Sequence, residues 1–410
     1  MRKRQYWIDL IGDGCLVVAG VLALFGLVLL VAFGVAGLRH VPFLHGLGVP
    51  ALDQPFMDLH GVAAWCEADA KGIDPAVEQT QIEFADGKRH PNFLMNYPPV
   101  VLWMRHAGLS PDRVVVFGIL LGLAYIGTCL YLMGRCGVKD GVLWAGFLVS
   151  PLSLMVIERA NLDILVFVCF GLALSLRRAP WASGAPILIA GLLKLYPGAA
   201  LAAIWMSGNR HGRVWASIFC GMLILYLLTL LPSLPAISGS LQNQSKSCFG
   251  ADVLVDILFA HGVIDLSGAG ILSNLTKLLA LFAAISGIGA GFFIGNSTSA
   301  PTVSERSQFA FWLAAPMSIV LFVLSNQMDY KWTFLLFLVP VALELARRGY
   351  ALSHLAKLWI VAMAVYSYWT FFSGEESLRN ALLKQSVMWA GFLMTSVLTG
   401  HMLRARRQSL

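Results

Sequence analysis

Hydrophobic positions along this chain gather in long runs that polar residues seldom interrupt. The first run, Gly14–Leu38, carries no charge and is long enough to cross a hydrocarbon core. Ten further apolar runs follow: Val114–Met133, Gly141–Ile157, Leu162–Leu176, Pro186–Trp205, Val214–Leu231, Gly270–Ile294, Phe309–Leu324, Trp332–Leu345, Leu355–Phe372 and Val387–Leu403. This pattern predicts an all-α polytopic membrane protein.

The composition supports that fold class. Hydrophobic residues make up 58% of the 410 positions and charged residues 12%, whereas a soluble domain carries about 25% charged residues. The first run follows Arg2, Lys3 and Arg4, and no small-residue cleavage signature comes after it. We therefore expect a retained first span rather than a removed signal peptide.

Basic residues set the expected topology, because short cytoplasmic loops are enriched in Lys and Arg. Eleven simple spans cannot place every basic cluster on the side of the N-terminus, and the conflict arises between Arg178 and Arg210. The intervening apolar run contains "KLYP", in which Lys194 is unfavourable in hydrocarbon and Pro197 breaks a helix. Two short helices there give about twelve passes, with both termini cytoplasmic, in a single integral-membrane domain over residues 1–410. A bacterial inner (plasma) membrane is the expected location.

The same topology gathers the polar stretches on the exoplasmic face. These stretches are the loop at residues 39–113, "ERANLD" at residues 158–163, the connection at residues 235–268 and "NQMDYK" at residues 326–331. Ionisable groups at membrane depth usually mark a pathway or a site, because burying them is unfavourable. The sequence therefore predicts a polar cavity that opens on this face.

The loop at residues 39–113 is expected to form interfacial helices rather than a separate domain. "DLHGVAAWCEADAKGIDP" predicts a helix that ends at Gly72, and "VVLWM" after Pro98 and Pro99 is amphiphilic enough to lie at the interface. Within the first helix Asp58 stands near the membrane edge, where desolvation makes a carboxylate a better base. The alternative interpretation of Asp58 is a helix N-cap.

Four cations on the same face are candidates for binding an anionic group: Lys194, Arg159, Lys331 and Arg105, with His90, His106, Tyr196 and Tyr330 as hydrogen-bonding partners. Each of the first three has a structural alternative. Lys194 snorkels or pairs with Asp163 or Glu158, Arg159 pairs with Glu158, and Lys331 anchors a span at the interface.

Two more polar segments carry both a structural and a functional interpretation. In "ERANLD", Asn161 caps the following span or binds ligand, and Asp163, expected one turn into that span, is a buried acid that needs a partner. In "NYPP", Tyr97 stacks on a ligand or, with Trp103, anchors the chain at the interface.

The ordered motifs "DLHGVAAW", "KGIDP", "NYPPVVLW", "ERANLDILVF", "KLYPGAAL" and "DYKWTFLLFLVP" resemble the GT-C fold glycosyltransferases, from about Asp58 to Pro340. The resemblance is to glycosyltransferase family 87, which includes mycobacterial polyprenyl-phosphomannose-dependent mannosyltransferases and related arabinofuranosyltransferases. Each motif is short, and their order is the specific part.

This resemblance implies a membrane enzyme that moves a sugar from a polyprenyl-phosphate donor to a lipid-linked or glycan acceptor, with inversion. Asp58 matches the catalytic base. The remaining candidates come from the charges and polar groups of the exoplasmic face and not from the resemblance. The candidate donor phosphate contacts are Lys194, Arg159, Lys331 and Tyr196, and the candidate substrate contacts are His60, Asn96, Tyr97, Asn161, Asp163 and Tyr330. Many GT-C relatives carry a paired acid here, but Leu59 and His60 follow Asp58, so we expect no cofactor and find no support for a divalent metal. Mannose and arabinofuranose donors both remain open.

Other chemistries find little support in the sequence. No nucleotide-binding P-loop, HExxH or CxxC motif is present, and Cys66 and Cys248 are candidates for an exoplasmic disulfide. The net charge of +7 lies largely in cytoplasmic clusters, which favours membrane lipids over nucleic acid as the partner. The alternative function is a transporter or flippase for a polar or oligosaccharide-linked lipid, in which the same charges line a path. Charges on both membrane halves and internal symmetry are typical of that class, and neither is evident.

Overall fold

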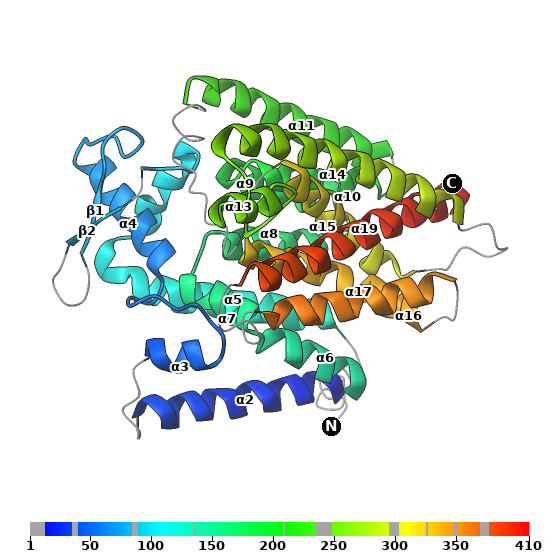
Figure 1. The fold of residues 1–410 in the computed structure, drawn as a ribbon, viewed down its shortest axis with the longest axis horizontal. Coiled ribbons are helices and arrows are strands. Elements are labelled where there is room, and N and C mark those ends of the chain that lie inside the picture. Colours follow the sequence, from blue (N-terminus) through cyan, green and yellow to red (C-terminus); the bar gives the residue numbers. More distant parts are fainter. Residues whose placement is uncertain are drawn as a thin grey trace. The chain divides into compact units, whose positions relative to one another are not determined.

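The structure is a computed structural model that describes residues 13–34, 40–83, 89–92, 94–134, 137–207, 210–233, 248–294, 303–324, 327–347, 351–369 and 377–409. Within these ranges almost all regular structure is helical (Figure 1). Five helices are long and apolar enough to cross a membrane, or six if one bent pair counts as a single span. The all-α class is therefore confirmed and the apolar helices are consistent with a membrane protein, whereas the twelve passes stay a prediction.

The chain forms two compact units. The first comprises Met1–Phe93, Leu102–Gly171 and Ser367–Gly374, and the second comprises Leu94–Val101, Leu172–Tyr366 and Glu375–Leu410.

The first unit contains the amino-terminal helices and the segment around Asp58. Its elements, with two that cross into the second unit, are α2 (Asp13–Gly34), α3 (His40–Gly46), α4 (Met57–Ala70), β1 (Gln81–Glu83), β2 (Arg89–Pro91), η1 (Pro99–Ala107), η2 (Pro111–Arg113), α5 (Val114–Met133), α6 (Val138–Leu148), α7 (Pro151–Arg159) and α8 (Asp163–Ser175). Strand β1 pairs antiparallel with β2, with Gln81 opposite Pro91. Helix α2 lies along α6, where a side chain at Gly141 would meet the backbone of Gly14.

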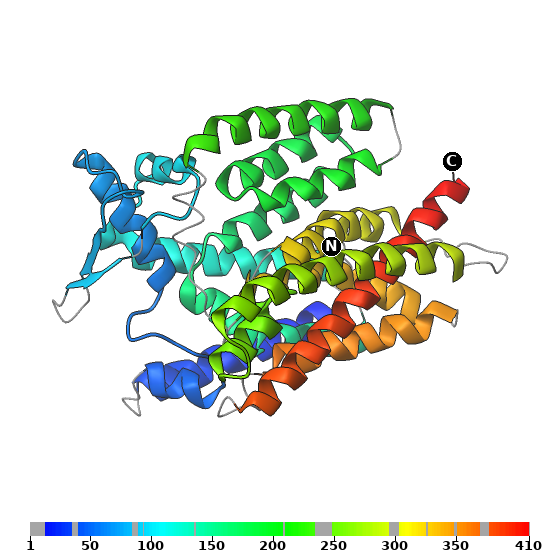
Figure 2. The same cartoon turned by 45° about the horizontal axis from the view of Figure 1, so that its top comes forward.

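The second unit is built around long apolar helices. Its elements are α9 (Pro180–Leu193), η3 (Tyr196–Leu201), α10 (Ala202–Trp205), α11 (Arg210–Leu230), η4 (Leu231–Ser233), β3 (Cys248–Phe249), α13 (Val253–Ala260), α14 (Leu266–Ile294), α15 (Glu305–Leu324), β4 (Gln327–Met328), η6 (Asp329–Leu338), α16 (Val339–Ala346), α17 (Ala351–Ser367) and α19 (Leu378–Ser409). Strands β3 and β4 pair antiparallel. Helix α14 packs along α19, as two views show (Figures 1 and 2).

The predicted break at "KLYP" is present. Helix α9 ends at Leu193, Lys194 is extended with φ −148° and ψ 117°, and the 3-10 helix η3 starts at Tyr196. Pro197 lies in the first turn of η3, where its missing N–H leaves no unmet hydrogen bond. The end of α4 just before Gly72 also matches the prediction, since Gly72 adopts φ 78°.

A second break was not predicted. The apolar run Gly141–Ile157 folds as α6 and α7, which meet at 52°. Ser150 caps α7 by accepting a hydrogen bond from the Ser153 backbone N–H at 3.3 Å, and Pro151 occupies the first helical position. A Ser-Pro pair is a known helix start, so the signal was present in the sequence.

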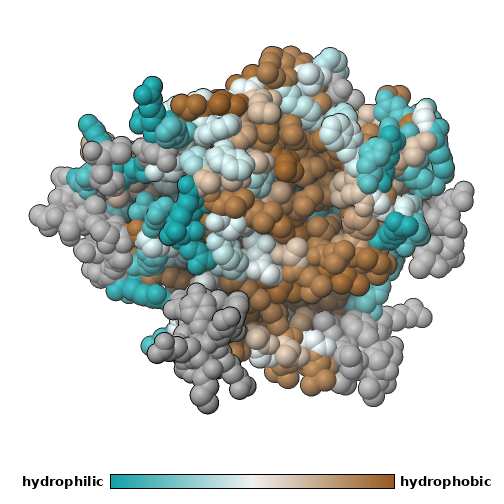
Figure 3. Space-filling model, turned by 180° about the vertical axis from the view of Figure 1, so that it is seen from behind, coloured by the Kyte–Doolittle hydropathy of each residue, from teal (hydrophilic) through white to brown (hydrophobic). Residues whose placement is uncertain are grey.

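Apolar side chains lie on the surface of several helices as well as in the core. Leu123 on α5, Leu225 on α11 and Phe282 on α14 are 61%, 65% and 68% exposed. Figure 3 shows hydrophobic side chains gathered over much of the face that it draws. A soluble protein rarely exposes so much apolar surface, and these helix faces are suited to lipid.

Candidate functional site

Asp58 lies near the start of α4, two residues after a residue in an unusual conformation. Phe56 has φ 62° and ψ 34°, in the left-handed region that a bulky side chain rarely adopts. Its ring packs against α5 at Gly118, where a Cβ atom would lie 2.5 Å from the ring. Phe56 occupies the N-cap position of α4, so the N-cap interpretation of Asp58 is wrong. Asp58 is instead the second helical residue and is half-buried.

Asn161 holds the Asp58 carboxylate. The Nδ2 of Asn161 donates to Oδ2 of Asp58 at 2.7 Å, while its Oδ1 accepts the backbone N–H of Asp163 at 2.9 Å. The second bond confirms that Asn161 caps the helix that follows, and it fixes the amide so that the NH₂ group faces Asp58. Ala160, directly before Asn161, is also left-handed, with φ 45° and ψ 42°.

Asp163 differs from its expected place. It is the first residue of α8 rather than one turn inside it, and it is 2% exposed. The acid therefore lies in the first helical turn, where the helix dipole favours a negative charge.

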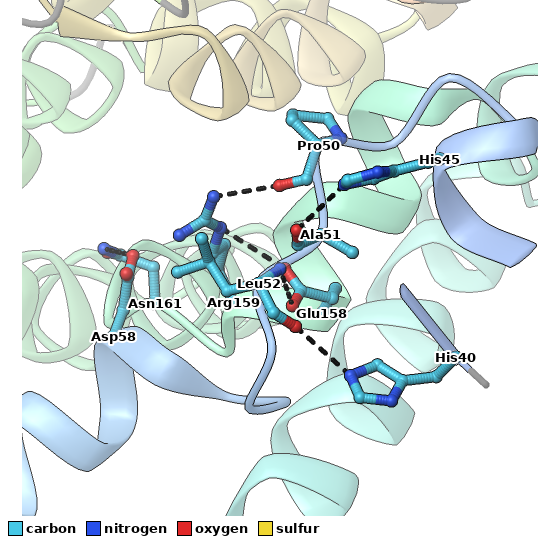
Figure 4. A network of polar contacts seen from close by, with 9 residues as sticks. All are labelled: His40, His45, Pro50, Ala51, Leu52, Asp58, Glu158, Arg159 and Asn161. Carbon is cyan, nitrogen blue, oxygen red and sulfur yellow. Dashed lines mark hydrogen bonds and ion pairs between the residues drawn. The ribbon is translucent and has the colours of Figure 1, made fainter. Parts of the chain in front are cut away.

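Glu158 and Arg159 form an ion pair at the end of α7, and both side chains contact the backbone of residues 50–52, which lead to Asp58 (Figure 4). The Arg159 Nε and Glu158 Oε2 atoms are 3.2 Å apart, and their side chains are 14% and 5% exposed. Glu158 Oε1 accepts the Leu52 backbone N–H at 3.1 Å, and Arg159 Nη2 donates to the Pro50 carbonyl at 3.0 Å. The local-pair interpretation of Arg159 is thus confirmed.

Two histidines of α3 hold the same segment. The His40 Nε2 lies 3.2 Å from the Leu52 carbonyl oxygen, and the His45 Nε2 lies 3.0 Å from that of Ala51 (Figure 4). A carbonyl can only accept, so both ring nitrogens donate. Side chains from α3 and from the end of α7 therefore fix the backbone of residues 50–52.

His60 lies one turn from the start of α4 and is buried. Its Nε2 accepts the amide N–H of Gln54 at 2.7 Å. Burial lowers the pKa of His60 below its ordinary value of 6.5. The ring is therefore neutral near pH 7.

In the second unit the predicted lysines and tyrosines form two cation–π contacts. The Nζ of Lys194 lies 4.6 Å from the centre of the Tyr97 ring, and that of Lys331 lies 5.2 Å from the Tyr196 ring. Tyr196 also meets Phe334 edge to face, with ring centres 6.2 Å apart. Lys194 is 5% exposed. Because Lys194 and Tyr196 are two residues apart, the four residues form one cluster, which we call the lysine–tyrosine cluster.

A pocket adjoins this cluster through Lys331. It is small, with room for about one water molecule, and its apolar wall includes Ile319, Phe322, Leu335 and Phe392. Lys331 is the charged residue of its lining. The pocket thus combines a hydrophobic wall with a cation.

The remaining predicted residues have separate environments. Asn96 is half-buried in the second unit. Arg105 pairs with Asp69, and His106 is exposed. The side chains of Tyr330 and His90 lie outside the described residues.

The side chain of Cys248, the other candidate for a disulfide with Cys66, lies outside the described residues. Cys66 is buried, and burial raises the pKa of its thiol to about 11. The thiol is therefore protonated near neutral pH and is a poor nucleophile.

Five residues that shape the site were not predicted from the sequence: His40, His45, Gln54, Phe56 and Gly118. A left-handed Phe has no sequence signature, and Gly118 resembles any other glycine in an apolar helix. In the part of the chain that the structure describes, no three His, Cys, Asp or Glu side chains are placed to hold a metal ion. The chain matches no protein-family model, no curated protein and no solved structure.

Proposed function

We propose that this protein is an integral-membrane glycosyltransferase that uses a polyprenyl-phosphate sugar as donor. Asp58 is the general base that takes the proton of the acceptor hydroxyl. The hydroxyl oxygen forms a bond to the anomeric carbon as the bond from that carbon to the phosphate oxygen breaks. The electron pair leaves with polyprenyl phosphate, and the configuration of the sugar inverts.

The observation that carries this proposal is the hydrogen bond between Asp58 and Asn161. Left-handed residues other than glycine are unfavourable by roughly 1–3 kcal/mol and cluster at functional sites. Phe56 and Ala160 are the two such residues in the described ranges. Each lies within two residues of a partner in that hydrogen bond. A half-buried carboxylate held in one orientation suits a general base, which must meet its proton at hydrogen-bond distance.

The lysine–tyrosine cluster is suited to the leaving phosphate. Negative charge grows on the phosphate oxygens as the glycosidic bond breaks, and fixed cations stabilise it. Lys194 and Lys331 supply that charge, and Tyr196 supplies a hydroxyl. Apolar side chains lie beside Lys331, and contact with such side chains is favourable for an isoprenoid chain. We place the reaction on the exoplasmic face of a bacterial inner membrane, with a glycan or glycolipid as acceptor.

The test replaces Asp58 by Asn in purified protein and follows release of polyprenyl phosphate from a panel of radiolabelled polyprenyl-phosphate sugars. Loss of a general base lowers turnover by about 10²–10⁴-fold, so we expect at least a hundredfold loss with unchanged donor binding. Asp53→Asn is the matched control, because Asp53 is an exposed acid of the same segment, and it should keep full activity.

Two outcomes would reject the proposal. Full activity in Asp58→Asn would show that Asp58 is not the general base. Movement of intact donor across proteoliposomes by the wild-type protein, without release of polyprenyl phosphate, identifies a transporter instead.

A further inference from the structure

The segment of residues 50–56, which we call the strap, ends two residues before Asp58 and is held to the end of α7 at three points. The Glu158 side chain accepts from the Leu52 N–H, the Arg159 side chain donates to the Pro50 carbonyl, and the Glu158 carbonyl accepts from the Phe56 N–H at 2.7 Å. All three contacts reach strap backbone atoms. They therefore fix the path of the chain whatever side chains the strap carries.

These contacts and the Asp58–Asn161 hydrogen bond form a closed ring. From Glu158 the chain runs through the left-handed Ala160 to Asn161, across the hydrogen bond to Asp58, and back through the left-handed Phe56 to the Glu158 carbonyl. A strained residue persists only where its surroundings over-determine it. Here both strained residues belong to the ring, one on each side of the hydrogen bond.

A buried ion pair is a weak source of stability, because desolvation opposes the attraction between the charges. Glu158 and Arg159 are adjacent in sequence and buried together, and both direct polar atoms at the strap. Their arrangement is suited to fixing the position of the strap backbone. The Arg159 guanidinium meets both Glu158 and the Pro50 carbonyl oxygen.

We infer that Glu158 and Arg159 are positioning residues, which fix Asp58 through the strap, and that Arg159 does not contact the donor. This inference rests on the proposed function for its link to turnover. A misplacement of about 1 Å in a reacting group lowers turnover by up to about a hundredfold. Loosening the strap should therefore lower kcat and leave donor affinity unchanged.

The fit of Phe56 against α5 provides a second, independent way to move the strap. A methyl group at Gly118 would lie 2.5 Å from the Phe56 ring, whereas one at Gly127 of the same helix meets nothing within 4 Å. Gly118→Ala should displace Phe56 and with it Asp58. Gly127→Ala is the matched control and should behave as wild type.

The experiment measures kcat and KM for the donor, and backbone amide hydrogen exchange over residues 50–57, in Glu158→Ala, Arg159→Lys, Gly118→Ala and Gly127→Ala. We expect a tenfold or larger fall in kcat, a KM within about twofold of wild type and faster strap exchange in the first three variants. Arg159→Lys, which keeps the charge, should lose less than Glu158→Ala.

Three results would overturn the inference. A raised KM with unchanged kcat in Arg159→Lys would make Arg159 a donor contact. Unchanged hydrogen exchange of the strap in Glu158→Ala would show that Glu158 does not hold the strap. Full activity in Gly118→Ala with a displaced strap would show that the strap does not position Asp58. If Asp58→Asn keeps full activity, the proposed function fails, while hydrogen exchange still tests the strap because it does not depend on turnover.

Discussion

At the scale of single residues, the site is defined by backbone conformation as much as by side-chain chemistry. Phe56 and Ala160 both adopt positive φ angles, and each leads into one partner of the Asp58–Asn161 hydrogen bond. Asn161 illustrates how one side chain serves two roles, since capping α8 turns its NH₂ group towards the acid. The structural and functional interpretations of Asn161 are therefore compatible.

His60 gives a prediction at the same scale. Its pKa is lowered by burial, so the unfolded chain takes up a proton near pH 6.5 whereas the folded chain does so at lower pH. Folding stability should therefore fall as the pH drops from about 7.5 through 6.5 and level off below the folded pKa. Melting temperatures in detergent across this range should show a steeper decline in wild type than in His60→Asn.

His106 provides the control for this pH dependence because its side chain is exposed. The variant His106→Asn should keep the wild-type slope. An unchanged slope in His60→Asn would show that His60 does not take up a proton between the folded and unfolded states in this range.

At the scale of elements, close helix packing depends on small residues at the contact. A Cβ atom at Gly291 of α14 would lie 1.9 Å from the Val397 carbonyl oxygen of α19, and one at Gly400 would lie 1.9 Å from the Ile288 carbonyl oxygen. Gly287 and Gly291 are four residues apart on α14, and Ser396 and Gly400 are four apart on α19. This is the spacing by which small residues let membrane helices approach.

Gly291→Ala should therefore destabilise the second unit. The obstructing atoms are backbone and cannot rotate away, and overpacking of this kind is unfavourable by about 1–3 kcal/mol. Gly289→Ala is the matched control on the same helix, because a Cβ atom there meets nothing within 4 Å and alanine favours helix. Thermal unfolding in detergent should show a lower melting temperature for Gly291→Ala only, and equal melting of the two variants would contradict the packing argument.

At the scale of the whole molecule, the break at Lys194 bears on how the chain crosses the membrane. Helix α9 is 14 residues long and α10 is 4, and each is shorter than the roughly 20 residues of a full helical span. The short-helix pair proposed from the basic clusters therefore fits the lengths of these elements. Its two ends should then lie on the same side of the membrane.

Cysteine labelling tests this topology. Trp181 is 60% exposed and His211 is exposed. In a Cys220→Ser background, both Trp181→Cys and His211→Cys should be shielded from an impermeant thiol reagent in intact cells and labelled after permeabilisation. Asp53→Cys should label in intact cells and serves as the positive control. Labelling at one end of the pair alone would overturn the short-helix interpretation.

The sequence by itself determined the class of the protein, the positions of most helices and the breaks at Gly72 and Lys194. Apolar runs, proline and glycine act through local sterics and through transfer into lipid, and both effects are readable along the chain. The sequence also indicated Tyr97 and Lys194 as separate candidates on one face. It did not predict that they contact each other, because contacts between distant segments follow from packing. The tertiary structure alone decided that Phe56 and Ala160 are left-handed, that Arg159 holds the strap, and that Gly118 receives the Phe56 ring. Those features arise where segments about fifty to a hundred residues apart constrain each other's backbone, and a linear pattern carries no record of such constraints.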